Sequence, residues 1–170
     1  RFTVDVMDDV ETLGVAYGRL ANEFQRLHVI PELDAYRFST YAKLAGNQDT
    51  TALTKSNIYG ALIDAQTTMD EAEVPEEGRV LFVSNATYNL MKQSTEVNKQ
   101  WSVQQRADSM GINFNVEYFD TIRVEKVPQR RFIDAVNILD GDNGGFEPDE
   151  GARNINFLFL HPSAIMQIQK

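Results

Sequence analysis

A turn, an apolar strand and a short helix follow one another within residues 74–93, and this order limits the folds open to the chain. Gly78 marks the turn. Residues 80–83 form a continuous apolar run, which is typical of a strand buried on both faces. Ser84 or Asn85 is placed to cap the helix that follows. The segment therefore predicts a domain that combines helices with a sheet.

Apolar residues spaced three and four apart predict a long amphipathic helix over residues 8–29. Asp8 and Glu11 fit a capping box at its first turn. Pro31 is expected to interrupt this helix and to open a second one, which Gly46 ends. The apolar stripe of the first helix should be buried and should anchor it; its members are Leu13, Tyr17, Leu20, Phe24 and Leu27.

The remaining segments mix helix and strand patterns. Ser56 is a candidate N-cap of a third helix, whose apolar stripe is Ile58, Leu62, Ala65 and Met69. Residues 97–110 are polar and weakly periodic. Residues 113–127 alternate as a hairpin does, with Asp120 and Thr121 at its turn. Residues 140–151 have the Gly, Asp and Pro content of a loop. Residues 155–160 are a second apolar strand. Helices first and then mixed elements indicate an α+β fold.

Composition narrows the function classes. At 170 residues the chain fits one domain or two small ones, and it has no cysteine for disulfides or thiolate metal sites. Its net charge is −9, and its only adjacent basic pair is Arg130 with Arg131, near Lys126. Since duplex binding needs clustered cations, we expect no direct nucleic-acid binding. No apolar run approaches the about 20 residues of a membrane span. The chain begins at Arg1, and we expect it to be part of a longer protein.

His28 and His161 are the only histidines, so any Ser-His-Asp arrangement must use one of them. Ser163 lies two residues after His161, but no G-x-S-x-G motif surrounds it. His28 is expected near a helix C-terminus, where the helix dipole favours a cation. We expect both histidines to have structural roles and no residue to be catalytic.

Two acidic groups could hold a divalent ion. Residues 140–145 resemble the start of a calcium loop, but Gly144 and Gly151 stand where the fifth and twelfth ligands belong. Asp5, Asp8, Asp9 and Glu11 are better explained as helix-capping and solvated charges. An acidic metal-dependent hydrolase using Asp5, Asp8 and Asp9, or Asp140 and Asp142, is the alternative function of a different class. We expect no metal site and no cofactor.

Other polar and aromatic groups have simpler explanations. The carboxylates Glu71, Glu73, Glu76 and Glu77 are expected to be solvated. Trp101, Tyr118 and Phe119 could form an exposed recognition surface, but aromatic residues in an alternating strand are more often part of the core.

The chain resembles the major capsid proteins of tailed bacteriophages. DDVETLGVAYGRLANEFQRLHVIPELDAYRFSTYA, from Asp8, is similar to their long spine helix, and MDEAEVPEEGRVLFVSNATYNLMKQ, from Met69, resembles the start of their axial domain. VEKVPQRRF, from Val124, and INFLFLHPSAIMQIQK, from Ile155, are similar to later axial-domain strands. The resemblance covers nearly the whole chain and rests on the order of these structural segments.

The resemblance implies a capsid-like α+β fold truncated at both ends. Residues 1–50 would hold the spine-helix part of a peripheral domain, and residues 51–170 a mixed sheet-and-helix axial domain. The protein would be a non-enzymatic structural subunit of a phage or prophage, self-assembling into pentamers and hexamers of an icosahedral shell that encloses the genome. An encapsulin-like shell is the close alternative. Its partners would be copies of itself, together with a scaffold, a portal and a maturation protease. It would assemble in the cytoplasm of the bacterial host and reside in the virion capsid.

Overall fold

The computed structural model describes residues 15–108, 111–139 and 144–165. Its contacts form two compact units, which we call the helical unit (Arg1–Leu44 with Ile133–Arg153) and the sheet unit (Ala45–Phe132 with Asn154–Lys170). The division expected from the sequence was a single boundary near residue 50. The contacts instead place the boundary after Leu44 and join residues 133–153 to the helical unit.

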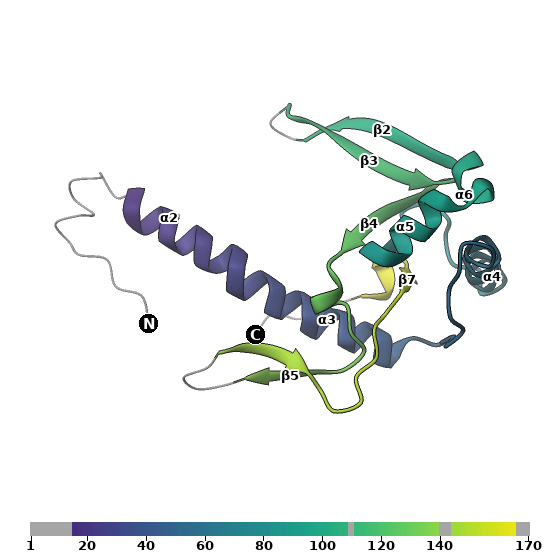
Figure 1. Ribbon diagram of the computed structural model, residues 1–170. Coiled ribbons are helices and arrows are strands. Elements are labelled where there is room, and N and C mark those ends of the chain that lie inside the picture. Colours follow the sequence, from purple (N-terminus) through teal and green to yellow (C-terminus); the bar gives the residue numbers. More distant parts are fainter. Residues whose placement is uncertain (1–14, 109–110, 140–143, 166–170) are drawn as a thin grey trace. The chain divides into compact units, whose positions relative to one another are not determined.

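One continuous helix dominates the helical unit (Figure 1). It consists of α2 (Val15–Phe24), the π-helical segment η1 (Gln25–Val29) and α3 (Ile30–Leu44). The prediction that Pro31 separates two helices is wrong. A proline ring clashes with the carbonyl four residues earlier in an α-helix. Here the N–H of Ile30 donates to the carbonyl of Gln25, five residues back, and this wider turn directly before Pro31 accommodates the ring.

A hairpin packs on the second half of that helix. Strands β5 (Val136–Leu139) and β6 (Gly145–Pro148) pair antiparallel, and both contact α3, where Ala35 and Phe38 are buried. The expected loop over residues 140–151 therefore contains a strand. The sequence hid this strand because Gly145, with a φ of 115°, opens it and Pro148 closes it.

The sheet unit is built on five strands in the order β2-β3-β4-β1-β7 (Figure 1). The strands are β1 (Val80–Ser84), β2 (Trp101–Ala107), β3 (Asn113–Phe119), β4 (Ile122–Val127) and β7 (Phe157–Leu160). Only β1 and β4 run parallel among these neighbours, so the sheet is mixed. The structure thus has the α+β character expected from the sequence. The β3–β4 hairpin turns at Asp120 as predicted, whereas β2 was not predicted.

Helices accompany the sheet in the same unit. They are α4 (Ile58–Glu71), α5 (Asn85–Gln93) and α6 (Thr95–Lys99), with the short 3-10 turns η2 (Gln129–Arg131) and η4 (Pro162–Ala164). Asn57, not Ser56, stands at the N-cap position of α4, but its side chain makes no capping hydrogen bond. Its Oδ1 accepts from the Thr54 N–H and its Nδ2 donates to the Ala52 carbonyl, which holds the preceding loop.

The core of the sheet unit lies between the sheet and these helices. Leu81 and Val83 of β1 are buried there, while Val80 and Phe82 on the other face of β1 are only half-buried. The strand was expected to be buried on both faces, and this is correct for one face only. The other core side chains are Ile58, Leu62, Met91, Val97, Phe119, Ile122 and Val124.

Two local contacts fix the segment from the end of α4 to α5. The Ser84 hydroxyl accepts a hydrogen bond from the Thr87 N–H at 3.1 Å, which caps α5 as predicted. The buried Arg79 guanidinium donates to the carbonyls of Val74 and Pro75 and pairs with Asp70 at 2.6 Å. None of the helices in the described part of the chain has both the length and the apolar content that crossing a bilayer requires.

Candidate functional site

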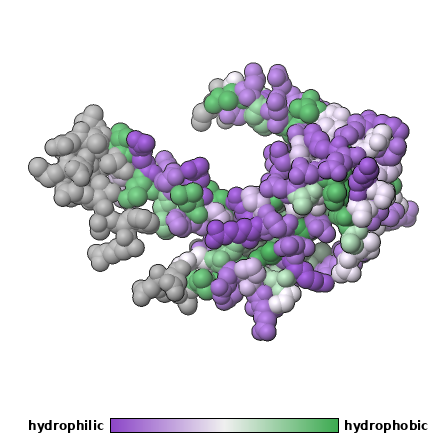
Figure 2. All heavy atoms as spheres, in the orientation of Figure 1, coloured by the Kyte–Doolittle hydropathy of each residue, from purple (hydrophilic) through white to green (hydrophobic). Residues whose placement is uncertain are grey.

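The most conspicuous exposed surface is apolar and lies on α2 and η1. We call Tyr17, Leu20, Phe24 and Leu27 the α2 stripe. Tyr17 is 65%, Phe24 42% and Leu27 53% exposed, and Leu20 is half-buried. Figure 2 shows apolar residues along this part of the helix. The expectation that this stripe is buried is wrong for these residues, and Leu13 lies outside the described residues.

The physical reason lies in what covers the helix. The three-four spacing continues from the α2 stripe through Ala35 and Phe38, which are buried in α3. The β5–β6 hairpin contacts α3 and so covers the later part of the apolar run. Periodicity identifies an apolar face, but it does not tell how far along the helix a partner extends. Among the residues that the structure describes, the α2 stripe is thus an apolar face with three exposed members and one that is half-buried.

His28 belongs to this same surface. It lies in η1, and its ring stacks on Phe24 with centroids 5.3 Å apart. It was expected near a helix C-terminus, but the helix continues to Leu44. The helix dipole therefore does not favour a cation at His28, because dipole effects are confined to the terminal turns.

His161 and Ser163 are brought together by the η4 turn. The His161 Nδ1 lies 2.6 Å from the Ser163 Oγ, and its Nε2 lies 3.0 Å from the carbonyl oxygen of Glu77. A carbonyl only accepts, so Nε2 carries the proton and Nδ1 accepts from the serine hydroxyl. A hydroxyl that donates to an imidazole is the first element of nucleophilic catalysis. Here, however, Nδ1 also accepts from the Ser163 N–H at 3.2 Å. Capping of η4 and attachment to the Glu77 turn account for these three contacts.

The acidic candidates supply no metal site in the described part of the chain, where no cluster of three or more potential metal ligands occurs. Asp5, Asp8, Asp9, Glu11, Asp140 and Asp142 lie outside the described residues. Glu71, Glu73, Glu76 and Glu77 are exposed, as expected for solvated charges.

The aromatic candidates belong mainly to the core. Tyr118 and Phe119 are buried and Trp101 is half-buried. Trp101 packs edge-on against Tyr88 at 5.7 Å, and the Lys92 ammonium lies 4.6 Å from the centre of the Trp101 ring. Sequence reasoning missed Tyr88, because its partners come from three separate elements. No local pattern could have identified it.

Tyr88 is held by charged neighbours. Its hydroxyl donates to the Glu117 carboxylate at 2.9 Å, and the Lys126 ammonium lies 4.6 Å from its ring centre. Burial, and then the hydrogen bond to Glu117, raise the pKa of Tyr88. This contact network joins α5 to β3 and β4.

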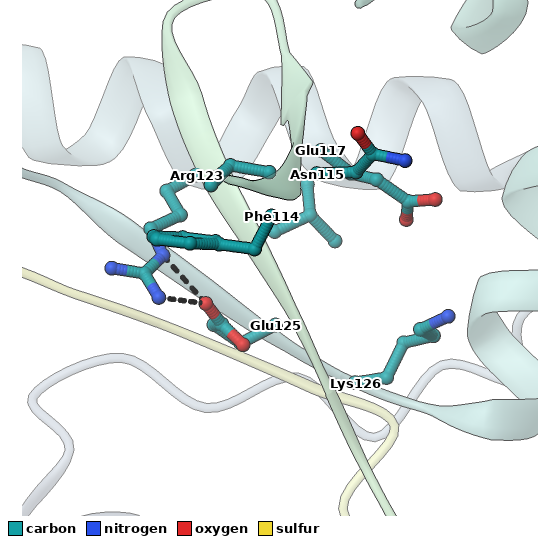
Figure 3. Close-up of a pocket in the computed structure, with 8 residues that line it drawn as sticks. Phe114, Asn115, Glu117, Arg123, Glu125 and Lys126 are labelled. Atoms are coloured by element: carbon teal, nitrogen blue, oxygen red, sulfur yellow. Dashed lines mark hydrogen bonds and ion pairs between the residues drawn. The ribbon is translucent and has the colours of Figure 1, made fainter. Parts of the chain in front are cut away.

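A shallow hollow of about 370 Å³ lies at the β3–β4 pair (Figure 3). Arg123 and Glu125 form an ion pair on one side of β4, and Figure 3 shows Glu117 and Lys126 apart from them. The lining contains two carboxylates and two cations but no serine, cysteine or histidine. Both carboxylates have partners: Glu125 pairs with Arg123, and Glu117 accepts a hydrogen bond from the Tyr88 hydroxyl.

Comparisons with protein-family models, with curated proteins and with solved structures find no match to this chain.

Proposed function

We propose that the chain is a structural subunit that assembles with copies of itself into a closed protein shell, as the major capsid proteins of tailed bacteriophages do. The observation that carries the proposal is the exposed α2 stripe. Contiguous exposed apolar side chains are uncommon on monomeric proteins and mark contact surfaces. A shell subunit needs such surfaces, because closed symmetry requires complementary patches on every copy.

The coarse architecture and the sequence resemblance support the same proposal. A helical unit with one long helix and a separate mixed-sheet unit agree with the spine helix and sheet-and-helix domain that the resemblance implies. An acidic surface suits the wall of a nucleic-acid container better than a nucleic-acid binder, because like charges repel. An encapsulin-like shell has the same requirements and is the close variant. In the phage case the subunit would assemble in the host cytoplasm and reside in the virion.

The proposal assigns no catalytic activity to the chain. Reproducible hydrolysis of an ester, phosphate or glycoside, lost in Ser163→Ala or in a variant of one carboxylate, would contradict it. Titration calorimetry with calcium, magnesium and manganese tests the metal-dependent hydrolase separately. That alternative requires a stoichiometric site, whereas a shell subunit does not.

Assembly can be tested directly with matched variants of the long helix. Phe24→Glu places a charge on the α2 stripe, and Asn22→Glu places the same charge at an exposed position off the stripe. With salt added to screen the net charge, we expect light scattering and electron microscopy to show oligomers or particles for the wild-type chain and for Asn22→Glu. Phe24→Glu should shift the population toward the monomer. A wild-type chain that stays monomeric under all salt and crowding conditions, with scaffold present, contradicts the proposal.

A further inference from the structure

Strand β2 forms one edge of the five-stranded sheet. It pairs with β3 in an antiparallel register that runs from Trp101 opposite Phe119 to Ala107 opposite Asn113. In the described part of the chain no strand lies along its other side. An edge of this kind presents a row of backbone donors and acceptors to any strand that approaches it.

The hydrogen bonds at the two ends of the β2–β3 hairpin show which residues of β2 have backbone N–H and C=O groups that point away from β3. The Asp120 N–H donates to the Gln100 carbonyl at 2.9 Å, and the Asp108 N–H donates to the Ile112 carbonyl at 3.0 Å. Both pairs continue the β2–β3 register, so the even-numbered residues of β2 are bonded to β3. Hydrogen-bonded and non-bonded pairs alternate in an antiparallel ladder. The outward N–H and C=O groups therefore belong to Trp101, Val103, Gln105 and Ala107.

This edge has few of the features that block pairing. Natural edges are protected by proline, by bulges or by several charges, lysine above all. Strand β2 has the sequence WSVQQRA, with Arg106 as its only charged residue and no proline. Val103 is 54% exposed. A strand could therefore add here without burying an unpaired carboxylate.

We propose that β2 pairs antiparallel with β2 of a second copy of this chain, about a twofold axis at Gln104. The inference rests on the proposed function only in its choice of a second copy as the partner. In this symmetric register, each of the four β2 residues with outward N–H and C=O groups lies opposite another such residue of the second copy. Trp101 lies opposite Ala107 of the partner copy, and Val103 lies opposite its Gln105. The two five-stranded sheets become one continuous sheet.

Charge also favours self-pairing in this register. Arg106 lies opposite Ser102 of the second copy, and the two Gln104 side chains meet on the axis. No like charges oppose each other on β2, although the chain as a whole carries −9. Like charges placed directly opposite each other destabilise a strand pair. The self-complementary register avoids that cost, and this is why a second copy fits the edge.

The absence of native cysteine permits a sharp test. In Gln104→Cys the two cysteines form a non-hydrogen-bonded pair with Cα atoms about 4.5 Å apart. Disulfides require Cα atoms about 4.4–6.8 Å apart. The matched control Gln105→Cys makes the same change one residue along, but its sulfur faces Val103 of the partner copy. Under mild oxidation of the purified protein we expect Gln104→Cys to form covalent dimers at least about tenfold faster than Gln105→Cys.

Two further variants test the same pairing without covalent chemistry. Gln104→Glu brings two carboxylates together at the axis and should weaken the dimer in sedimentation, with salt restoring it. Gln105→Glu should leave dimerisation nearly unchanged. Val103→Pro removes an outward N–H without removing a bond to β3, so the protein should stay folded by circular dichroism while the β2-paired dimer weakens in sedimentation.

The outcomes separate this inference from the proposed function. If Gln104→Cys cross-links no faster than Gln105→Cys while the wild-type chain still forms oligomers that Phe24→Glu disrupts, the edge pairing is wrong and the shell proposal stands. If the wild-type chain is monomeric at every concentration and neither cysteine variant cross-links, both are wrong. Preferential cross-linking at residue 104 supports the pairing.

Discussion

Ser84 is the residue at which the chain changes from strand β1 to helix α5. Its hydroxyl accepts from the Thr87 N–H, and the whole residue is buried. Helix starts leave N–H groups without helical partners, and a side-chain oxygen at the N-cap satisfies one of them. We expect Ser84→Ala to lower the free energy of unfolding by about 1 kcal/mol, measured by urea denaturation.

Ser94 provides the control for this prediction. It is the N-cap of α6 and is also buried, but its side chain makes no capping hydrogen bond. Ser94→Ala should therefore lower the free energy of unfolding less than Ser84→Ala. Equal losses for the two variants would show that the loss comes from the buried volume and not from the cap.

Tyr88 gives the stability of the sheet unit a dependence on alkaline pH. Burial and the hydrogen bond to Glu117 raise its pKa, while the Lys126 ammonium over its ring opposes the shift. As the pH rises past about 10, the unfolded chain releases this proton before the folded chain does. The stability that Tyr88 contributes is therefore complete below that pH and is lost as the pH rises toward the folded pKa.

The measurement compares wild type with Tyr88→Phe. Free energies of unfolding between about pH 8 and 11 should fall more steeply for the wild type, because a phenylalanine ring has no proton to release. The lysines near the ring, Lys92 and Lys126, are present in both proteins and cancel in the comparison. Parallel pH profiles would contradict the raised pKa.

At the scale of elements, local sequence patterns predicted the features whose interacting residues are close together in the sequence. The Ser84 cap and the β3–β4 turn at Asp120 were predicted because their partners are within a few residues. Strand β2 was missed because its side chains do not alternate, and β3 holds it through backbone bonds. Arg79 was missed because its acceptors are two loop carbonyls and the carboxylate of Asp70, and no sequence pattern links them.

The α2 stripe shows the same limit for burial. The spacing of Tyr17, Phe24 and Leu27 predicted the helix, and that helix exists. Their burial would have required a covering element, and in the described part of the chain the β5–β6 hairpin contacts α3. The exposure of these residues determines the candidate site, because the residues expected in the core form the proposed contact surface.

The same substitution at two phenylalanines tests whether the α2 stripe is exposed within one chain. Phe119 is 1% exposed in the core of the sheet unit, whereas Phe24 is 42% exposed. Phe119→Ala should lower the free energy of unfolding by about 3–5 kcal/mol, as for a buried phenylalanine. Phe24→Ala should cost within about 1 kcal/mol in dilute protein, as for an exposed site. A large loss for Phe24→Ala at low concentration would show that the α2 stripe is covered within one chain.

At the scale of the whole molecule, apolar contact and net charge act in opposite directions. The exposed apolar side chains of α2 and the open edge of β2 favour association, while a net charge of −9 makes copies repel each other. Salt shortens the range of that repulsion, from about 30 Å at 0.01 M to about 10 Å at 0.1 M. It leaves the burial of apolar surface and the backbone hydrogen bonds in place.

We therefore expect a monomer or small oligomer in dilute buffer of low salt, and larger species as salt is added. Sedimentation velocity across a salt series at fixed protein concentration measures this. The sign of the effect identifies the force that joins the copies. Ion pairs between oppositely charged patches would weaken with salt, so dissociation on adding salt would contradict association through the α2 stripe and the β2 edge. If added salt promotes association in the wild type and fails to do so in Phe24→Glu, the copies associate through the α2 stripe, and charge repulsion between copies opposes that association at low salt.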